Sequence, residues 1–305
     1  MVVDQIQGVI MPIKFMLQQY IESDHVLQAI RDGLKISTDG SFKSLVDGSI
    51  WQSRTAEMVD RLVIPINIFF DDFVTGDTSS PHARSTSMCG VYLSVACLPR
   101  YLSGRLCNIL TAGFIKTQDK KDFRNDQTLK KIIADLIDLE IDGLDIQSNG
   151  NTIKAYFVIG FVVGDNLGVN GVLDYVECFR ANHFCRVCKR TRVQTESDCL
   201  EYPNYLRSVE NYEQDIELND VSRTGLKARS IFNNIPSFHV IHNFYFDVMH
   251  DVLEGVALYD LQHILYYLVN VKQYISVVDL NHRKNLFVYG SLNSITYWTT
   301  SGKAT

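Results

Sequence analysis

The stretch that decides the fold is Leu62-Val-Ile-Pro-Ile-Asn-Ile-Phe-Phe70, and two carboxylates, Asp71 and Asp72, follow it directly. Its apolar, β-branched and aromatic residues are typical of a buried strand. Residues 152–164 form the strongest such run in the chain, and they lead directly into Asp165. Each of these two strands is therefore expected to end on a carboxylate.

Shorter strands and helical patterns surround these two runs. Residues 90–98 and 106–115 are expected to be strands. Residues 126–139 have the pattern of an amphipathic helix, with Asp126 able to cap its start and Gly143 after its end. Further helices are expected at residues 13–33, 171–180 and 246–268. This order of elements predicts an α/β protein with a mixed central sheet flanked by helices.

Changes in these residue patterns along the chain divide it into five expected parts. The expected parts are an N-terminal helical preface (1–60), the first part of the α/β core (61–180), an inserted cysteine-containing segment (181–245), a core helix with an acidic residue (246–270) and a degenerate or truncated C-terminal tail (271–305).

Composition excludes several classes of protein. The chain has 305 residues, of which 46% are hydrophobic, and its formal net charge is −6, which argues against a polybasic nucleic-acid coat. Its longest strongly apolar run, 156–164, is about half of the ~20 residues that a membrane helix needs. The N-terminus lacks the basic region of a secretory signal. With seven irregularly spaced cysteines, these features predict a nuclear or intracellular protein with reduced thiols and no membrane association.

Three acidic residues are candidates for one metal site. Adjacent strands would bring Asp71 and Asp165 to the same edge of the sheet, and a helix packed across that edge would add Glu254. Three converging carboxylates can hold two Mg²⁺ or Mn²⁺ ions, which stabilise the attacking and leaving oxygens of a phosphoryl transfer. The alternative for each strand-end aspartate alone is a turn-forming role.

The helix that carries Glu254 has a distinctive polar pattern. Asp247, His250, Asp251 and Glu254 stand at i, i+3, i+4 and i+7, which puts them on one face of an α-helix. Three carboxylates on one face are unfavourable unless the face is solvated or binds cations. Both interpretations remain open.

Cys185 and Cys188 form a C-x₂-C pair, a spacing that lets both thiolates reach one Zn²⁺ ion. The pair supplies two of four ligands, and His250 is the leading candidate for a third. Further candidates are His242, His239, His183 and Cys199. The alternative is a pair of free thiols in a basic loop.

Two groups of basic residues could neutralise DNA phosphates. The first group is Lys116, Lys120, Lys121, Arg124, Lys130 and Lys131. The second group surrounds the cysteine pair: Arg186, Lys189, Arg190 and Arg192. A solvated surface is the better interpretation of the first group, whereas the second is more suggestive because the cysteine segment could lie beside the carboxylates.

Four strings in these regions match the motifs of one known family. They are Phe70-Asp71-Asp72-Phe73-Val-Thr-Gly-Asp77, Gly164-Asp165-Asn166-Leu167-Gly168, Phe184-Cys-Arg-Val-Cys188 and Asp247-Val-Met-His-Asp-Val-Leu-Glu-Gly255. They resemble, in order, the Y-x-D-D/E-F-E-x-x-N-P-L-G-S segment, the second-aspartate motif, the C-x₂-C insertion and the D-x-M-H-D-x-L-E-G box of CACTA (En/Spm)-type DNA transposases. The resemblance extends over about residues 39–268.

The resemblance implies an RNase H-like core with an inserted zinc-knuckle-like segment and a DDE catalytic triad of Asp71, Asp165 and Glu254. Asp72 is the weaker alternative for the first acid and a further candidate metal ligand. The family's cysteine pair and D-x₂-H element map onto Cys185, Cys188, Asp247 and His250. Family members cut transposon ends and join the freed 3′-hydroxyl to target DNA, so DNA is the expected partner, and self-association into a homo-oligomer is a further expectation.

The chain also departs from the family pattern. Asp77-Thr-Ser-Ser-Pro81 replaces most of the N-P-L-G-S run, and residues 291–305 follow no recognised pattern. Three hypotheses follow: a metal-dependent transposase core that cleaves and transfers DNA strands, a truncated or domesticated and inactive relative that binds DNA or protein, and a zinc-containing DNA- or RNA-binding module with incidental acids.

Overall fold

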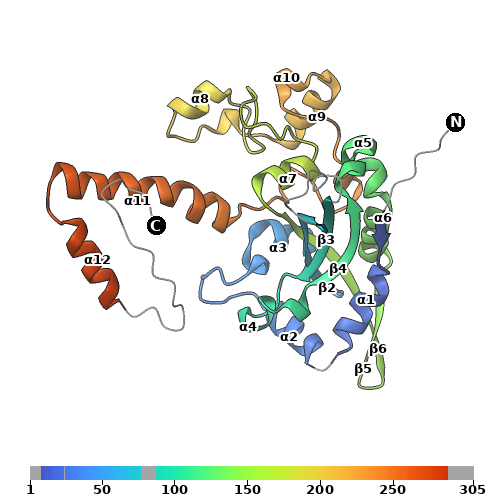
Figure 1. Ribbon diagram of the computed structural model, residues 1–305. Coiled ribbons are helices and arrows are strands. Elements are labelled where there is room, and N and C mark those ends of the chain that lie inside the picture. The colour runs from blue at the N-terminus through green and yellow to red at the C-terminus, as the bar shows by residue number, and fades with distance from the viewer. Residues whose placement is uncertain (1–7, 24, 77–86, 288–305) are drawn as a thin grey trace. The chain divides into compact units, whose positions relative to one another are not determined.

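The computed structural model describes residues 8–23, 25–76 and 87–287. The chain divides into two compact units, residues 1–245 and 246–305. The first unit is built on a mixed six-stranded sheet with helices packed against it (Figure 1). The predicted α/β class with a mixed central sheet and flanking helices is therefore confirmed.

The sheet has the strand order β1-β4-β3-β2-β6-β5. Its strands are β1 (Gly8–Ile10), β2 (Leu62–Val74), β3 (Ser87–Val95), β4 (Leu110–Lys116), β5 (Leu144–Ser148) and β6 (Asn151–Val163). Strands β2, β3 and β4 are consecutive antiparallel neighbours, whereas β6 runs parallel to β2 on its other side. Near the end of the first unit the chain passes along β6 again, and Phe244 forms a parallel bridge with Val162.

Strand β2 lies in the middle of the sheet because both of its faces are apolar. Residues 63–66 are all buried, as expected for a strand that is covered on both sides. Further along, Ile68 and Phe70 are buried on one face, and burial of each such side chain contributes about 1.5–3 kcal/mol. Burial stops at Asp71 and Asp72, which are both exposed. The strand thus carries two carboxylates out of the core.

Helices and short turns cover the sheet. In the sheet region they are α1 (Ile13–Ile21), α2 (Val26–Gly33), η1 (Leu45–Asp47), α3 (Ser49–Thr55), α4 (Arg100–Ser103), η3 (Leu106–Asn108), α5 (Thr117–Thr128), α6 (Lys130–Ile141) and α7 (Asn166–Val172). Helices α1 and α6 contact each other, α1 also contacts β5, and α6 contacts β6. The connection from β4 to β6 runs through α5, α6 and β5.

The cysteine-containing segment is made of short elements: α8 (Arg192–Ser197), η4 (Pro203–Tyr205), α9 (Val209–Leu218), α10 (Val221–Thr224) and η5 (Ile231–Asn234). In Figure 1, α8, α9 and α10 lie together beyond one end of the sheet, on the side of α7.

The second unit is helical in its described part. It contains the π-helical η6 (Val248–Val256), α11 (Ala257–Tyr266), the π-helical η7 (Tyr267–Val271) and α12 (Val277–Leu286). Gly255 has non-helical torsions, with φ −95° and ψ −109°. The helix expected at residues 246–268 is therefore helical but not a regular α-helix. Across the described ranges, no helix is long and apolar enough to cross a membrane.

Some predicted boundaries are wrong. The helix expected at 126–139 is α6, which begins at Lys130 and is preceded by the separate helix α5. Asp126 lies inside α5 and caps nothing, since Leu129 is the N-cap of α6. The error arises because residues 117–128 are polar and lack an apolar period, although packing on the sheet makes them helical.

Other differences have the same origin in tertiary structure. The helix expected at 13–33 is two helices, α1 and α2, and the one expected at 171–180 lies earlier, as α7. The third strand begins at Leu110 and not at residue 106. Edge strands β1 and β5 were not expected, because both are short. The replaced run at 77–81 and the pattern at 291–305 lie outside the described residues.

Candidate functional site

The ends of β2 and β6 bring two of the predicted acids to one edge of the sheet. The strands are parallel neighbours, and Phe69 lies opposite Val163 in their register. The paired register ends there, and Asp71 and Asp165 each follow the last paired residue of their segment by two positions, Asp165 as the N-cap of α7. Both aspartates are exposed. Two exposed carboxylates from distant parts of the sequence thus lie at the same end of this strand pair.

Tyr92 of β3 borders Asp71 from the other side. Asp71 lies opposite Gly90 in the antiparallel register of β2 and β3. The Tyr92 ring crosses Gly90 so closely that an added Cβ would lie 2.3 Å from the Tyr92 hydroxyl oxygen, so only glycine leaves room for it. Burial raises the pKa of Tyr92, and the charge of Asp71 raises it further. Tyr92 is a protonated hydroxyl beside Asp71 that sequence reasoning missed.

Asp72 lies on the opposite face of β2 from Asp71 and is engaged there. Lys120 Nζ lies 3.6 Å from Asp72 Oδ1, and Thr117 Oγ1 donates to the same oxygen at 3.4 Å. Lys120 Nζ also donates to Cys89 Sγ at 3.2 Å. Burial lowers the pKa of Lys120, but Cys89 and Asp72 raise it by more. A cation therefore holds Asp72, whereas Asp71 lies beside Tyr92.

Asp165 has a structural role in addition to its place at the sheet edge. It is the N-cap of α7, and its Oδ1 accepts the N–H of Gly168 at 2.5 Å. Such a cap stabilises a helix by about 1 kcal/mol. A carboxylate has roughly four acceptor sites on two oxygens, so capping uses only part of its capacity.

The second unit carries the remaining predicted acids. Asp247 accepts the N–H of Met249 at 3.0 Å and forms an ion pair with His250, whose hydrogen bond lowers the pKa of Asp247. Residues 248–256 wind as a π-helix, in which successive turns are wider than in an α-helix. The expectation that Asp247, His250, Asp251 and Glu254 share one face assumes α-helical winding; the ion pair keeps Asp247 and His250 together, and the π-helical winding changes the spacing of the other two around the axis.

Cys185 and Cys188 form a turn that is held by backbone N–H groups. Cys185 Sγ accepts the N–H groups of Val187 and Cys188, both at 3.4 Å. The pKa of the Cys188 thiol is raised overall. Burial is the main cause and Cys185 adds to it, whereas the Arg190 N–H opposes the rise. Both thiols are half-buried. Two sulfurs on one turn are chemically suited to a soft ion such as Zn²⁺.

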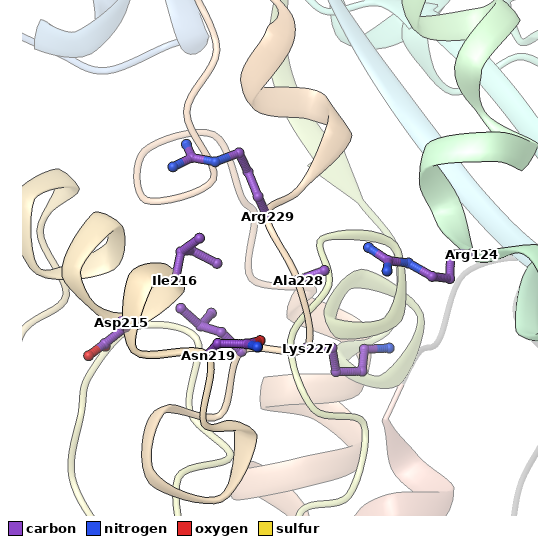
Figure 2. A pocket seen from close by; sticks show the side chains of 8 residues that line it. Arg124, Asp215, Ile216, Asn219, Lys227, Ala228 and Arg229 are labelled. Carbon is purple, nitrogen blue, oxygen red and sulfur yellow. The ribbon is translucent and has the colours of Figure 1, made fainter.

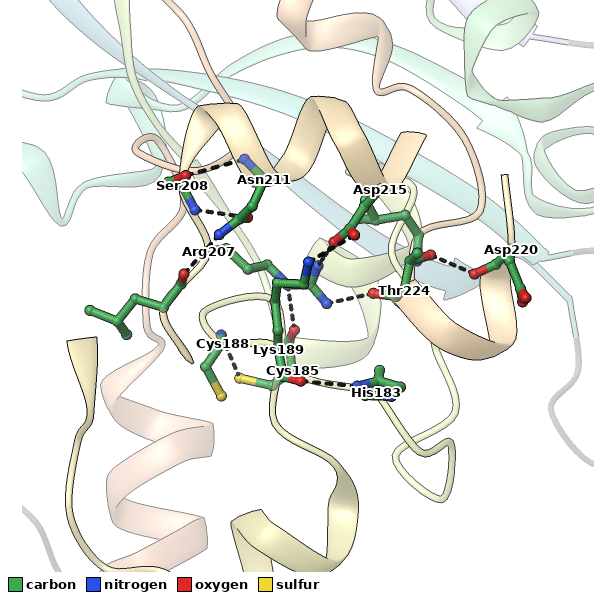
Figure 3. Close-up of polar contacts among 12 residues, drawn as sticks. His183, Cys185, Cys188, Lys189, Arg207, Ser208, Asn211, Asp215, Asp220 and Thr224 are labelled. Carbon is green, nitrogen blue, oxygen red and sulfur yellow. Dashed lines mark hydrogen bonds and ion pairs between the residues drawn. The ribbon is translucent and has the colours of Figure 1, made fainter. Parts of the chain in front are cut away.

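A buried ion network fixes this turn to the rest of the segment (Figure 3). Arg207 is 6% exposed, and it donates to the carbonyl oxygens of Cys185 at 3.1 Å and Thr224 at 2.7 Å. It also pairs with Asp215 at 3.4 Å, and Lys189 pairs with the other Asp215 oxygen at 2.8 Å. The network joins the cysteine turn to α9 and α10. No local sequence pattern predicts it, because its members are far apart in the chain.

Two of the other candidate zinc ligands, His183 and His239, have partners of their own. The Nδ1 atom of His183 lies 3.1 Å from the Lys189 carbonyl oxygen. His239 lies 3.9 Å from Glu213, and its ring centroid is 6.2 Å from that of His242. Cys199 is exposed. In the parts of the chain that the structure describes, no three His, Cys, Asp or Glu side chains form a metal-binding group.

The structure also revises the interpretation of both basic groups. The Lys120 side chain is only 16% exposed, so the solvated-surface interpretation is wrong for this residue. Arg186 and Arg190 are each 6% exposed, and Arg190 stacks on the rings of Tyr202 and Tyr205. These two arginines are therefore structural and do not form the phosphate-facing surface that the sequence suggested.

Comparison of the chain with protein-family models found no match, and comparison with curated proteins found none either.

Proposed function

We propose that this chain is the catalytic core of a DDE-type DNA transposase, which cleaves and transfers DNA strands with the help of divalent metal ions. The observation that supports the proposal is the parallel pairing of β2 and β6, after which both segments continue into exposed aspartates, Asp71 and Asp165, at the same end of the sheet. Three antiparallel strands, a connection through two helices and the short strand β5, and a strand parallel to the first are compatible with the RNase H-like core that the resemblance implies. The motif resemblance and this topology support the same proposal.

The donor chemistry at this edge suits Mg²⁺ or Mn²⁺. Asp71 and Asp165 offer carboxylate oxygens, the ligand type that these ions prefer. We assign them as two protein ligands; a third, Glu254, is implied by the motif resemblance alone. When bound, the ions would supply charge stabilisation at the reacting phosphodiester. Asp72 is the weaker ligand candidate, because it is already paired with Lys120.

The remaining side chains at the edge have definable tasks in this proposal. Tyr92 can donate its hydroxyl hydrogen beside Asp71, since burial and the Asp71 charge keep its pKa high. Asp165 anchors the start of α7 through Oδ1, and its second oxygen would be the metal ligand. Cys185 and Cys188 are proposed to hold a structural Zn²⁺, for which His250 is a third ligand on the grounds of sequence alone. DNA, a homo-oligomeric state and a nuclear location belong to the same proposal.

The second candidate function is an inactive, domesticated relative that keeps the fold and binds DNA or protein. The capping contact of Asp165 favours it, because a carboxylate retained for helix capping needs no metal. The two candidates differ in one measurable property, which is cleavage that depends on Asp165.

The test is cleavage of short DNA duplexes in Mg²⁺ or Mn²⁺ by the wild-type chain and by Asp165→Ala. The exposed Asp145 of β5 provides a matched control, because Asp145→Ala removes a carboxylate from a different strand of the same sheet. The proposal expects cleavage by wild type and Asp145→Ala, and none by Asp165→Ala. Equal cleavage by all three proteins would contradict it, and absence of cleavage by wild type would favour the second candidate.

A further inference from the structure

Two neighbouring hollows share Arg229 and lie between the α5–α6 region and the segment from α9 to η5. Their volumes are about 230 Å³ and 250 Å³. Arg124 and Lys227 line the first hollow and Lys130 lines the second, and Figure 2 shows the first of them. We infer that this cationic groove binds phosphate groups of a DNA backbone, an inference that rests on the proposed function and adds how the DNA is held.

The lining of the groove is positive once its own carboxylates are accounted for. Four cations line it: Arg124, Lys130, Lys227 and Arg229. Two carboxylates also line it, Asp215 and Asp126. Asp215 is neutralised from the buried side by Arg207 and Lys189. Asp126 lies 3.7 Å from Arg124 and offsets one cation. Glu213 and Glu177 offset Arg229 and Lys227 in the same way, so four cations face three carboxylates and one net positive charge remains, which favours a polyanion.

The cations of the groove can exchange their present partners for phosphate. Arg229 pairs with Glu213, and Lys227 pairs with Glu177 at 2.5 Å. The side chains in both pairs are between about a third and a half exposed, and such pairs contribute only about 0–1 kcal/mol. An arginine can bind phosphate through two parallel hydrogen bonds, which are stronger than ordinary ones. Phosphate contacts can therefore replace these ion pairs at little net cost.

A buried hydroxyl without a partner lies beside the second hollow. Ser230 lines the second hollow beside Arg229 and is 1% exposed. Its Oγ is buried and has no hydrogen-bond partner among the described residues. A buried hydroxyl without a partner costs about 1–3 kcal/mol. The Oγ atom exposes less than 1 Å² of surface, so a phosphate oxygen in the hollow could accept its hydrogen bond only after the neighbouring side chains shift.

The backbone at Arg124 directs a cation toward the groove. Arg124 has a φ of 61° within α5, a conformation that is unfavourable for a residue with a side chain. In Figure 2 its guanidinium reaches from α5 toward Ala228, on the same side of the hollow as the amine of Lys227. Two chain segments distant in sequence thus present cations to one volume.

The test is binding of a short fluorescent DNA duplex of mixed sequence, measured by anisotropy against salt in EDTA, where no metal-dependent cleavage occurs. Arg229→Gln and Lys227→Gln should each weaken binding and lower the slope of log K against log salt by about 1. Arg229→Lys should retain most of the affinity. Arg223→Gln on α10 is the matched control, because Arg223 is exposed in the same segment and lines neither hollow.

Binding by Arg229→Gln and Lys227→Gln with wild-type affinity and salt slope would overturn the inference, and so would the absence of DNA binding by the wild-type chain. The proposed function fails separately, when DNA is bound but no metal-dependent, Asp165-dependent cleavage is found. Reduced binding by both glutamine variants, with unchanged binding by Arg223→Gln, is the supporting result.

Discussion

Charged side chains are exposed at the sheet edge around Asp71 but buried in the cysteine segment around Arg207. At the edge, Asp71 and Asp165 are exposed and sit at the ends of strands whose cores are already buried. In the segment, Arg207 and Asp215 are each 6% exposed and hold backbone and side chains together. The difference teaches which charges the fold requires and which are available for chemistry.

Breaking the buried network should give the largest loss of stability. Arg207→Ala leaves Asp215 with Lys189 alone and leaves the carbonyl oxygens of Cys185 and Thr224 without this donor. Removing one partner of a buried ion pair costs about 3–5 kcal/mol. Urea unfolding measures this loss. Arg192→Ala, which breaks the exposed pair with Glu196, is the control and should change little. A loss below about 1 kcal/mol for Arg207→Ala would show that the fold does not require this buried charge.

Asp174→Asn should have the next largest effect, and its sign depends on pH. Burial raises the pKa of Asp174 from 3.8 to about 7, with Lys227 opposing the shift. The folded state therefore prefers the protonated carboxyl, and its contribution to stability is full below about pH 4 and is lost as the pH rises through about 7. At pH 8 the variant should be more stable by about 2 kcal/mol. The measurement is the unfolding free energy from pH 4 to 8.

Asparagine can keep the hydrogen bond from Asn125 and suits the positive φ of 64° at this position. A pH dependence that is identical in wild type and Asp174→Asn would show that Asp174 has an ordinary pKa.

Tyr175→Phe should give a smaller change in the stabilising direction. Tyr175 is 1% exposed, and its hydroxyl has no hydrogen-bond partner among the described residues. Removing this buried hydroxyl should raise the unfolding free energy by about 1 kcal/mol. Tyr212→Phe is the matched control, because the Tyr212 hydroxyl accepts the N–H of Ser230 at 3.1 Å. The control should lose stability, so equal changes in the two variants would refute the distinction.

Asp71→Asn should have the smallest effect on stability, within about 0.5 kcal/mol, because the side chain is exposed. Thermal unfolding in EDTA measures this without a contribution from bound metal. A large loss would mean that Asp71 belongs with the structural charges and not with those available for chemistry.

The sequence predicts the centre of this fold better than its periphery. Strands β2 and β6 are recognisable because long apolar runs end abruptly on carboxylates. Strands β1 and β5 have three and five residues and pair at the edges, so they leave no comparable pattern. The kink at Arg124 is invisible for a related reason: only tertiary packing makes the polar residues around it helical.

The candidate site likewise has features that the sequence predicts and features that it does not. The parallel pairing of β2 and β6, which brings Asp71 and Asp165 to the same end of the sheet, is what two strand-end acids suggest. The separation of Asp72 from Asp71 follows from strand alternation, but its pairing with Lys120, 48 positions away, is not encoded locally. The contacts of Arg207 and the hollows around Arg229 likewise join residues that are distant in sequence. The roles of Glu254 and of the cysteine pair stay predictions.

Titration of the purified chain with Mn²⁺ in a calorimeter tests the central claim most directly, because it measures whether Asp71 and Asp165 bind a metal ion together. The wild-type chain should bind Mn²⁺, Asp71→Asn and Asp165→Asn should each lose that binding, and Asp72→Asn and Asp145→Asn should retain it. Binding by Asp71→Asn and Asp165→Asn that matches wild type would contradict the account.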